Sequence, residues 1–236
     1  MKAAILQCDR VLEHLQPRFG DYPGMIETMF EDAGHRNIEF DVWDCEQGQY
    51  PPDPAVYDFF ITTGSKADAW GDEPWVHQLL RFVRQLDQDR RHLIGICFGH
   101  QIIARALGGC VERSDKGWGI GIAHNRVFDC PPWMQPCPPQ LDLIVSHQDQ
   151  VTRLPGEDER VLAGSDFCPF FMLQWNDRFL SVQGHPEWQP AYAQALLEER
   201  RGVIEEDRIE QALQELQHST PDNGLFVQWM MAFIGS

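Results

Sequence analysis

The sequence predicts an α/β protein in three layers, with an open, mostly parallel sheet between two layers of helices. In the first half of the chain, short apolar segments suited to strands alternate with segments suited to helices. Strand, helix and strand in succession are typical of a parallel sheet covered on both faces. From Gly109 onward β-like segments predominate, which predicts a small antiparallel addition and later strands of the same sheet.

The expected elements are short and follow one another without an internal repeat. In the first half the expected strands are 3–7, 38–43, 59–62 and 93–96, and the expected helices are 22–33, 75–86 and 101–107. After residue 109 the expected strands are 118–128, 141–146, 161–164, 172–175 and 179–182.

Two later segments have distinctive compositions. Residues 129–140 hold five prolines and two cysteines, and because proline fixes φ and lacks an N–H, we expect a loop there. Residues 190–216 are rich in good helix formers and predict one or two helices with a break near Arg201-Gly202, and 225–234 predicts a short closing helix. We expect a single domain over residues 1–236, with the helices of about 190–236 packing on it or extending it.

Charge and hydropathy limit the partners. The chain has 236 residues, a formal net charge of −17 and only three lysines, so nucleic acid is not an expected partner. No apolar run approaches the roughly 20 residues of a membrane span, and the apolar stretch at the N-terminus is too short for a signal peptide. We expect a cytoplasmic protein that does not contact a membrane.

The cysteines do not indicate a metal site. There are seven, an odd number, and none shows the paired Cys-x-x-Cys spacing. This pattern suggests neither a disulfide framework nor a zinc site, so most are expected to be buried free thiols. We expect no metal and no cofactor.

The stretch 93–101 predicts a nucleophile turn. An apolar strand runs into Gly95-Ile96-Cys97-Phe98-Gly99, and a helix-compatible segment follows at once. A sharp strand-to-helix turn would leave Cys97 exposed beside a helix N-terminus, which favours a thiolate, and would point the N–H of Phe98 at an oxyanion. The alternative is a buried cysteine in an ordinary glycine-rich turn.

A histidine and a glutamate follow the last expected strand. Positions two apart in extended chain face the same way, so His185 and Glu187 in Gly184-His185-Pro186-Glu187 share a side. Glu187 can hold one imidazole nitrogen while the other faces a thiol. The alternative is a surface His-Pro-Glu turn.

Two other strand ends carry candidate site residues. Backbone amides of Gly64 or Ser65 can complete an oxyanion hole. His147 is a second candidate base, but the nearest acid, Asp149, is expected among loop residues, so His185 is preferred and His147 with Ser146 is assigned to substrate binding. His100 is expected to pack on its helix. Trp118 and Trp188 are expected to lie in the core or to line a pocket.

With these residues assembled, the chain resembles the class I glutamine amidotransferases. That family shares a Gly-x-Cys-x-Gly-x-Gln elbow, here ending at Gln101, and a late Gly-His-Pro-Glu. The resemblance implies a flavodoxin-like fold and a γ-glutamyl thioester on Cys97. It also implies that His185 moves protons and Glu187 orients it, and that Gln101, Ser146 and His147 hold the glutamyl group.

Within that superfamily the chain looks similar to stand-alone relatives of the GMP synthase glutaminase domain. Residues 63–75 and 147–151 are also similar to the plant γ-glutamyl peptidases. No Ser-Gly-Gly-x-Asp-Ser loop of an ATP pyrophosphatase is present, so the chain alone is not expected to make GMP. Gly64-Ser65-Lys66 stands where many amidotransferases have a Gly-Gly-Pro-like loop, which leaves the second oxyanion donor open.

Three functions follow as alternatives. The first is hydrolysis of a γ-glutamyl amide such as glutamine, with ammonia passed to a separate synthase partner. The second is a free-standing γ-glutamyl peptidase that acts on glutathione-like compounds. The third is a non-catalytic binding protein on the same fold.

Overall fold

A nine-stranded mixed sheet organises the chain. The computed structural model describes residues 1–236, and its strand order is β2-β1-β3-β4-β11-β10-β9-β6-β7. The neighbours from β2 to β11 pair in parallel, and those from β11 to β7 pair antiparallel. The strands are β1 (Lys2–Gln7), β2 (Glu39–Asp44), β3 (Phe59–Thr62), β4 (His92–Ile96), β6 (Gly119–Val127), β7 (Gln140–His147), β9 (Arg160–Gly164), β10 (Met172–Gln174) and β11 (Phe179–Val182). The predicted flavodoxin-like α/β fold is confirmed.

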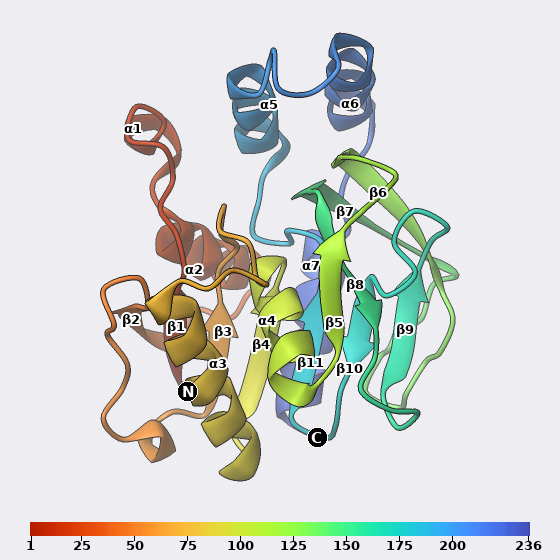
Figure 1. Cartoon of the computed structure of the whole chain (residues 1–236). Helices are drawn as coiled ribbons and strands as arrows, with labels where there is room; N and C mark the ends of the chain where they lie inside the picture. The colour runs from red at the N-terminus through yellow and green to blue at the C-terminus, as the bar shows by residue number, and fades with distance from the viewer.

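Helices cover both faces of the parallel half. Helices α3 (Pro74–Gln88) and α4 (Phe98–Leu107) lie in front of the sheet in Figure 1, whereas α2 (Tyr22–Asp32) and α7 (Asn223–Ile234) lie behind it. Alternation along β1 explains the two cores, because successive side chains point to opposite faces. Ala3 and Ile5 pack in the core shared with α2 and α7, while Ala4 and Leu6 pack in the core shared with α3 and α4.

Two later helices stand at one end of the molecule. Helices α5 (Pro190–Glu199) and α6 (Glu206–His218) lie side by side at the top of Figure 1, and the predicted break between them near Arg201-Gly202 is confirmed. Leu196 and Ile209 share a third apolar cluster with Ile122 of β6 and Ile144 of β7. The short helix α1 (Gln16–Phe19) and a 3₁₀ turn η1 (Pro54–Val56) complete the helical elements.

The predicted small antiparallel addition is confirmed as a separate two-stranded sheet, but its two strands were not located from the sequence. Strands β5 (Cys110–Arg113) and β8 (Asp149–Arg153) pair antiparallel beside α4. Asp149 therefore begins a strand, so the expectation that it lies in a loop is wrong. Both strands are short and end in exposed polar residues, which gives no apolar alternation to recognise.

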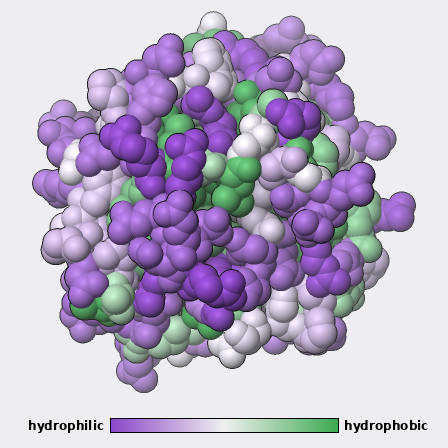
Figure 2. Space-filling model, turned by 60° about the horizontal axis from the view of Figure 1, so that its bottom comes forward, coloured by the Kyte–Doolittle hydropathy of each residue, from purple (hydrophilic) through white to green (hydrophobic).

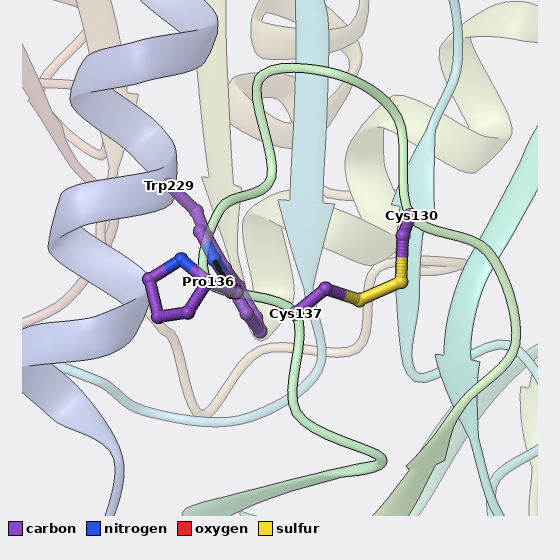
Figure 3. Close-up of a disulfide and its surroundings, with 4 residues drawn as sticks. All are labelled: Cys130, Pro136, Cys137 and Trp229. Carbon is purple, nitrogen blue, oxygen red and sulfur yellow. Dashed lines mark hydrogen bonds between the residues drawn. A yellow bond between two sulfur atoms is a disulfide. The ribbon is translucent and has the colours of Figure 1, made fainter.

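The proline-rich segment is a loop, as predicted, but it contains a disulfide. Cys130 and Cys137 are bonded, with Cα atoms 6.2 Å apart, a pairing that the sequence did not indicate. The turns of the loop bring the two residues within bridging range. Figure 3 shows the bond beside α7, whose Trp229 donates from Nε1 to the carbonyl of Pro136 at 2.9 Å. The other five cysteines are free thiols, and all except Cys110 are buried.

One face of the molecule is predominantly hydrophilic. On the face shown in Figure 2, polar side chains cover most of the area and hydrophobic ones show only in small separate groups. This is consistent with the net charge of −17. None of the helices combines the length and the apolar character needed to cross a bilayer.

Candidate active site

Cys97 occupies a strained turn between β4 and α4. Its φ and ψ are 49° and −98°, a left-handed φ that ordinary residues rarely adopt and that persists only where the surroundings impose it. The turn is tight because α4 approaches β3 closely. A Cβ at Gly99 would stand 1.6 Å from Oγ1 of Thr62, so only glycine fits there. The geometry is that of a nucleophile elbow.

The thiol is less accessible than the sequence suggests. Cys97 is only 5% exposed, so the expectation that it stands exposed at the turn is wrong. Nε2 of Gln183 lies 3.5 Å from its Sγ, and the loop after β3 approaches from another side. Cys97 nevertheless lines two clefts described below, and a ligand in either cleft can reach it.

His185 and Glu187 form a buried pair just beyond β11. Nδ1 of His185 lies 2.8 Å from Oε1 of Glu187, and the two residues are 2% and 3% exposed. The ring of Trp188 stacks on the imidazole with centroids 3.6 Å apart. The backbone N–H of His185 donates to the carbonyl of Ile144. These contacts fix both the tautomer and the orientation of the ring.

The charge state of His185 follows from its neighbours. Burial lowers its pKa, but the electrostatic interactions with Cys97 and Glu187 and the hydrogen bonds that the ring donates to both outweigh burial and raise the pKa to about 10. The free imidazole value is about 6.5. At neutral pH, His185 is therefore an imidazolium, with Glu187 at one ring nitrogen and Cys97 nearby.

The loop after β3 contacts both partners. A Cβ at Gly64 would lie 2.8 Å from Cε1 of His185 and 3.8 Å from Cβ of Cys97. The backbone N–H groups of Gly64 and Ser65 donate to no other group of the chain. Phe98 is the first residue of α4, so its N–H has no intrahelical acceptor. Three unengaged donors thus belong to segments that meet at the thiol.

Gln101, Ser146 and His147 lie around one side of Cys97. Nε2 of Gln101 donates to the carbonyl of Asp149 at 2.8 Å and to Oε1 of Gln183 at 3.1 Å. Ser146 accepts a hydrogen bond from the guanidinium of Arg200. All three of the predicted residues line the same cleft.

His147, the second candidate base, has a different setting from His185. Burial lowers its pKa to about 4, and its Nδ1 lies 3.2 Å from the carbonyl of Asp149 rather than from a carboxylate. It is therefore neutral at pH 7 and has no acidic orienter. His100 packs within α4 as predicted, with Nδ1 2.8 Å from Oγ of Ser181, and burial lowers its pKa to about 3.

Two clefts meet at the thiol. The Gln101 cleft has a volume of about 270 Å³ and the His185 cleft one of about 210 Å³. Gln101, His147 and Trp118 line only the first, whereas His185 and Trp188 line only the second. The residues common to both are Ser65, Lys66, Cys97, Ser146 and Arg200.

The sequence reasoning missed two residues of this site. Gln183 lies two positions before His185, so the alternation that paired His185 with Glu187 also placed Gln183 on their side. Arg200 had no such signal, because it reaches Ser146 across 54 residues of chain. No group of three or more His, Cys, Asp or Glu side chains is arranged to hold a metal ion.

Comparisons with known proteins identify the family of the chain. The family model described as glutamine amidotransferase class-I matches residues 29–201. γ-Glutamyl peptidase 3 of Arabidopsis thaliana is 29% identical over 96% of this chain and 93% of its own length. γ-Glutamyl peptidase 4 of the same organism is 34% identical over 75% of this chain and 71% of its own length. A glutamine amidotransferase structure from Thermotoga maritima has the same fold, with a TM-score of 0.78 and 19% identity over 100% of this chain and 98% of that one. The chain belongs to the class I glutamine amidotransferases.

Proposed function

We propose that the chain hydrolyses γ-glutamyl bonds through a thioester on Cys97 and that its substrates are γ-glutamyl peptides. The observation that carries this proposal is the position of His185. Its ring is held by Glu187 at 2.8 Å on one nitrogen and lies against Gly64, the same residue that approaches Cys97. This arrangement supports the roles of nucleophile for Cys97, base for His185 and orienter for Glu187 in acyl transfer.

In the first half-reaction, the thiolate of Cys97 attacks the γ-carbonyl carbon. The N–H of Phe98, with that of Gly64 or Ser65, stabilises the oxyanion of the tetrahedral intermediate. The imidazolium of His185 gives its proton to the leaving nitrogen as the C–N bond breaks. The products of this step are a free amine and a γ-glutamyl thioester.

The second half-reaction restores the enzyme. His185, now neutral, takes a proton from water as the water oxygen attacks the thioester carbonyl. The C–S bond then breaks, glutamate leaves, and the thiolate–imidazolium pair forms again. Glu187 keeps the imidazole in place through both steps and stabilises its charged form.

The size of the His185 cleft supports a peptide substrate. Hydrolysis of glutamine releases ammonia, a molecule about as small as water, whose share of liquid volume is about 30 Å³. The cleft beside the general acid holds about 210 Å³ and is walled by this chain's own Tyr192 and Leu196 of α5. The two relatives named γ-glutamyl peptidases support the same substrate class.

Glutamine hydrolysis with a separate ammonia-accepting synthase is the second candidate function. The description of the matching family supports it. Gln101, Ser146 and His147 are proposed to hold the γ-glutamyl group in both cases, so the two functions differ only in the leaving amine. A cytoplasmic location is part of the proposal; the reducing conditions there would keep the thiol of Cys97 free and would also open the Cys130–Cys137 bond.

A substrate panel tests the proposal. The purified protein is assayed for glutamate release from γ-glutamyl dipeptides, glutathione and glutamine, with Cys97→Ala as the inactive control. We expect steady turnover of the peptides without any partner. Turnover of glutamine only, rising when a synthase is supplied, would favour the second function, and full activity of Cys97→Ala would remove Cys97 from the mechanism.

Labelling tests the thiol independently of turnover. A glutamine-like alkylating agent should modify Cys97, as located by peptide mass spectrometry. Cys110→Ala is the matched control, because Cys110 is the only free thiol that is not buried. Labelling should be retained in Cys110→Ala and lost in Cys97→Ala. An inert Cys97 in a protein without turnover would indicate a non-catalytic binding protein.

A further inference from the structure

Arg200 is a cation of the two clefts that has no acidic partner. It follows the last residue of α5, is half-buried, and donates to the hydroxyl of Ser146. Its guanidinium also lies over the ring of Trp118, 4.7 Å from the centroid. The other cations that line the clefts are all ion-paired: Lys66 with Asp9, Arg10 with Asp21 and Asp44, and Arg113 with Asp68 and Asp149.

A partly desolvated arginine without a carboxylate is costly. Burial lowers its pKa, because removing the charge from water is compensated only when an anion or several acceptors replace the water. One hydroxyl and one aromatic face satisfy few of its five N–H donors. An anionic ligand in the cleft would supply what the protein does not.

The surroundings of Arg200 show which cleft an anion would occupy. Trp118, which covers one face of the guanidinium, lines only the Gln101 cleft. Arg200 itself also lines the His185 cleft, together with Tyr22 and Tyr192, which do not line the Gln101 cleft. An anion in the His185 cleft can therefore reach Arg200 without taking the place of Trp118.

We propose that Arg200 binds the carboxylate of the leaving group, so that the preferred substrates are γ-glutamyl amino acids or short γ-glutamyl peptides with a free C-terminus. The inference rests on the proposed function. His185 protonates the leaving nitrogen, so the amine departs into the cleft that His185 lines. In an amino acid the carboxylate is two bonds from that nitrogen, and a planar guanidinium binds carboxylates through paired hydrogen bonds.

The aromatic wall of the same cleft fits the rest of such a ligand. Trp188 stacks on His185, and Tyr22 lies nearly parallel to Trp188 with centroids 6.5 Å apart. The hydroxyl of Tyr22 lies 3.0 Å from that of Tyr192. These rings give an apolar surface for a leaving-group side chain, with Arg200 at its charged end.

A matched pair of substrates tests the assignment. γ-Glutamylglycine and γ-glutamylglycinamide differ only in the leaving-group carboxylate, and the measured quantity is the ratio of their kcat/KM values. In the wild type we expect the carboxylate substrate to be preferred about 10- to 100-fold, the range of a hydrogen bond to a charged group. Arg200→Gln should abolish most of this preference, mainly through KM, and Arg200→Lys should keep part of it.

Controls separate Arg200 from the general electrostatic field. Arg10→Gln also removes one positive charge from the His185 cleft, but Arg10 is already paired with Asp21 and Asp44. The ratio of the two kcat/KM values in Arg10→Gln should therefore equal that of the wild type. Thermal unfolding shows whether each variant is folded. If Arg200→Gln does not fold, the substrate preference of Arg200→Lys tests the role of Arg200 instead.

The outcomes are distinct. If Arg200→Gln lowers kcat/KM equally for both substrates, or changes neither, the leaving-group role is overturned. An equal loss would place Arg200 at the glutamyl half of the substrate. If the wild type hydrolyses neither peptide, the proposed function itself fails, and this is visible before any Arg200 variant is made.

Discussion

Gly64 lies directly against His185, so that a Cβ at position 64 would stand 2.8 Å from Cε1 of the imidazole. That separation is shorter than real Cβ atoms show, and the buried ring cannot move aside because Glu187 and Trp188 hold it. The absence of a side chain at 64 is what lets this loop approach both the base and Cys97.

Gly64→Ala should impair catalysis more than folding. The added methyl group would displace the loop or the imidazole, and a shift of about 1 Å in a reacting group can cost on the order of 100-fold in rate. We expect kcat to fall about 100-fold. Steady-state kinetics on a γ-glutamyl dipeptide measures this, and circular dichroism and thermal unfolding show that the fold is kept.

Gly24→Ala is the matched control for that substitution. Gly24 lies in α2, is exposed, and a Cβ there would meet nothing within 4 Å. Alanine should leave kcat unchanged and stabilise the helix by about 0.5–1 kcal/mol. Equal kinetics for the two alanine variants would contradict the role given to the Gly64–His185 contact.

The pH dependence of activity should reveal the pairing of His185 with Glu187. The reactive state needs the imidazolium, and the pKa of His185 is raised to about 10, so kcat/KM of the wild type should stay high until the pH approaches 10. In Glu187→Gln one of the two negative charges is lost. We expect the basic limb to move to lower pH and kcat to fall about 100-fold or more, as when a triad loses its orienter.

The same shift predicts how stability varies with pH. A group whose folded pKa is raised stabilises the fold fully below its unfolded pKa, here 6.5, and this contribution is lost as the pH rises through the folded pKa of about 10. The free energy of unfolding should therefore fall more steeply between these values in the wild type than in Glu187→Gln. Denaturant unfolding at several pH values measures it, and parallel curves would contradict the raised pKa.

Two local patterns predicted most of what was found. Short apolar runs located the strands of the parallel half, and the alternation of side chains placed His185 and Glu187 on one side, where they form a hydrogen bond. The elbow was recognisable because its glycines are required locally: a Cβ at Gly95 would stand 2.9 Å from the carbonyl of Gly99. These features depend on residues close together in the chain.

The features that escaped prediction depend on distant residues. Strands β5 and β8 are polar and pair across about 40 residues, so neither has a pattern of its own. Arg200 ends a helix with an ordinary sequence and matters only because α5 returns it to Ser146. The limited exposure of Cys97 likewise results from Gln183 and Gly64, which come from other segments.

Substitution of the two buried histidines should separate base from binding residue. His185→Asn removes the proton carrier, and we expect kcat to fall at least about 1,000-fold. His147→Asn keeps a donor for the carbonyl of Asp149, and because His147 is neutral with a pKa of about 4, we expect kcat to fall less than about 10-fold while KM rises. Steady-state kinetics on one γ-glutamyl dipeptide gives kcat and KM for both variants. If kcat fell by the same factor in both, His147 would be a proton carrier as well.

The disulfide of the 129–139 loop should contribute to stability without affecting activity. Cys130 and Cys137 are seven residues apart, and closing so short a loop in the unfolded chain is worth about 2–3 kcal/mol. For a domain of this size that corresponds to about 5–10 °C in melting temperature. Scanning calorimetry of Cys130→Ser/Cys137→Ser should show this decrease, and the reduced wild type should show it too.

Cys110→Ser is the control for that double variant, because Cys110 is a free thiol that is not buried. This variant keeps the Cys130–Cys137 bond, so reductant should lower its melting temperature by the same amount as it lowers that of the wild type. The loop is tied to α7 by the bond between Trp229 and the carbonyl of Pro136, and that contact remains after reduction, so kcat should not change. If the double variant had the same melting temperature as the oxidised wild type, the stabilising role would be contradicted. The same would follow if Cys130 and Cys137 were free thiols in the non-reduced protein.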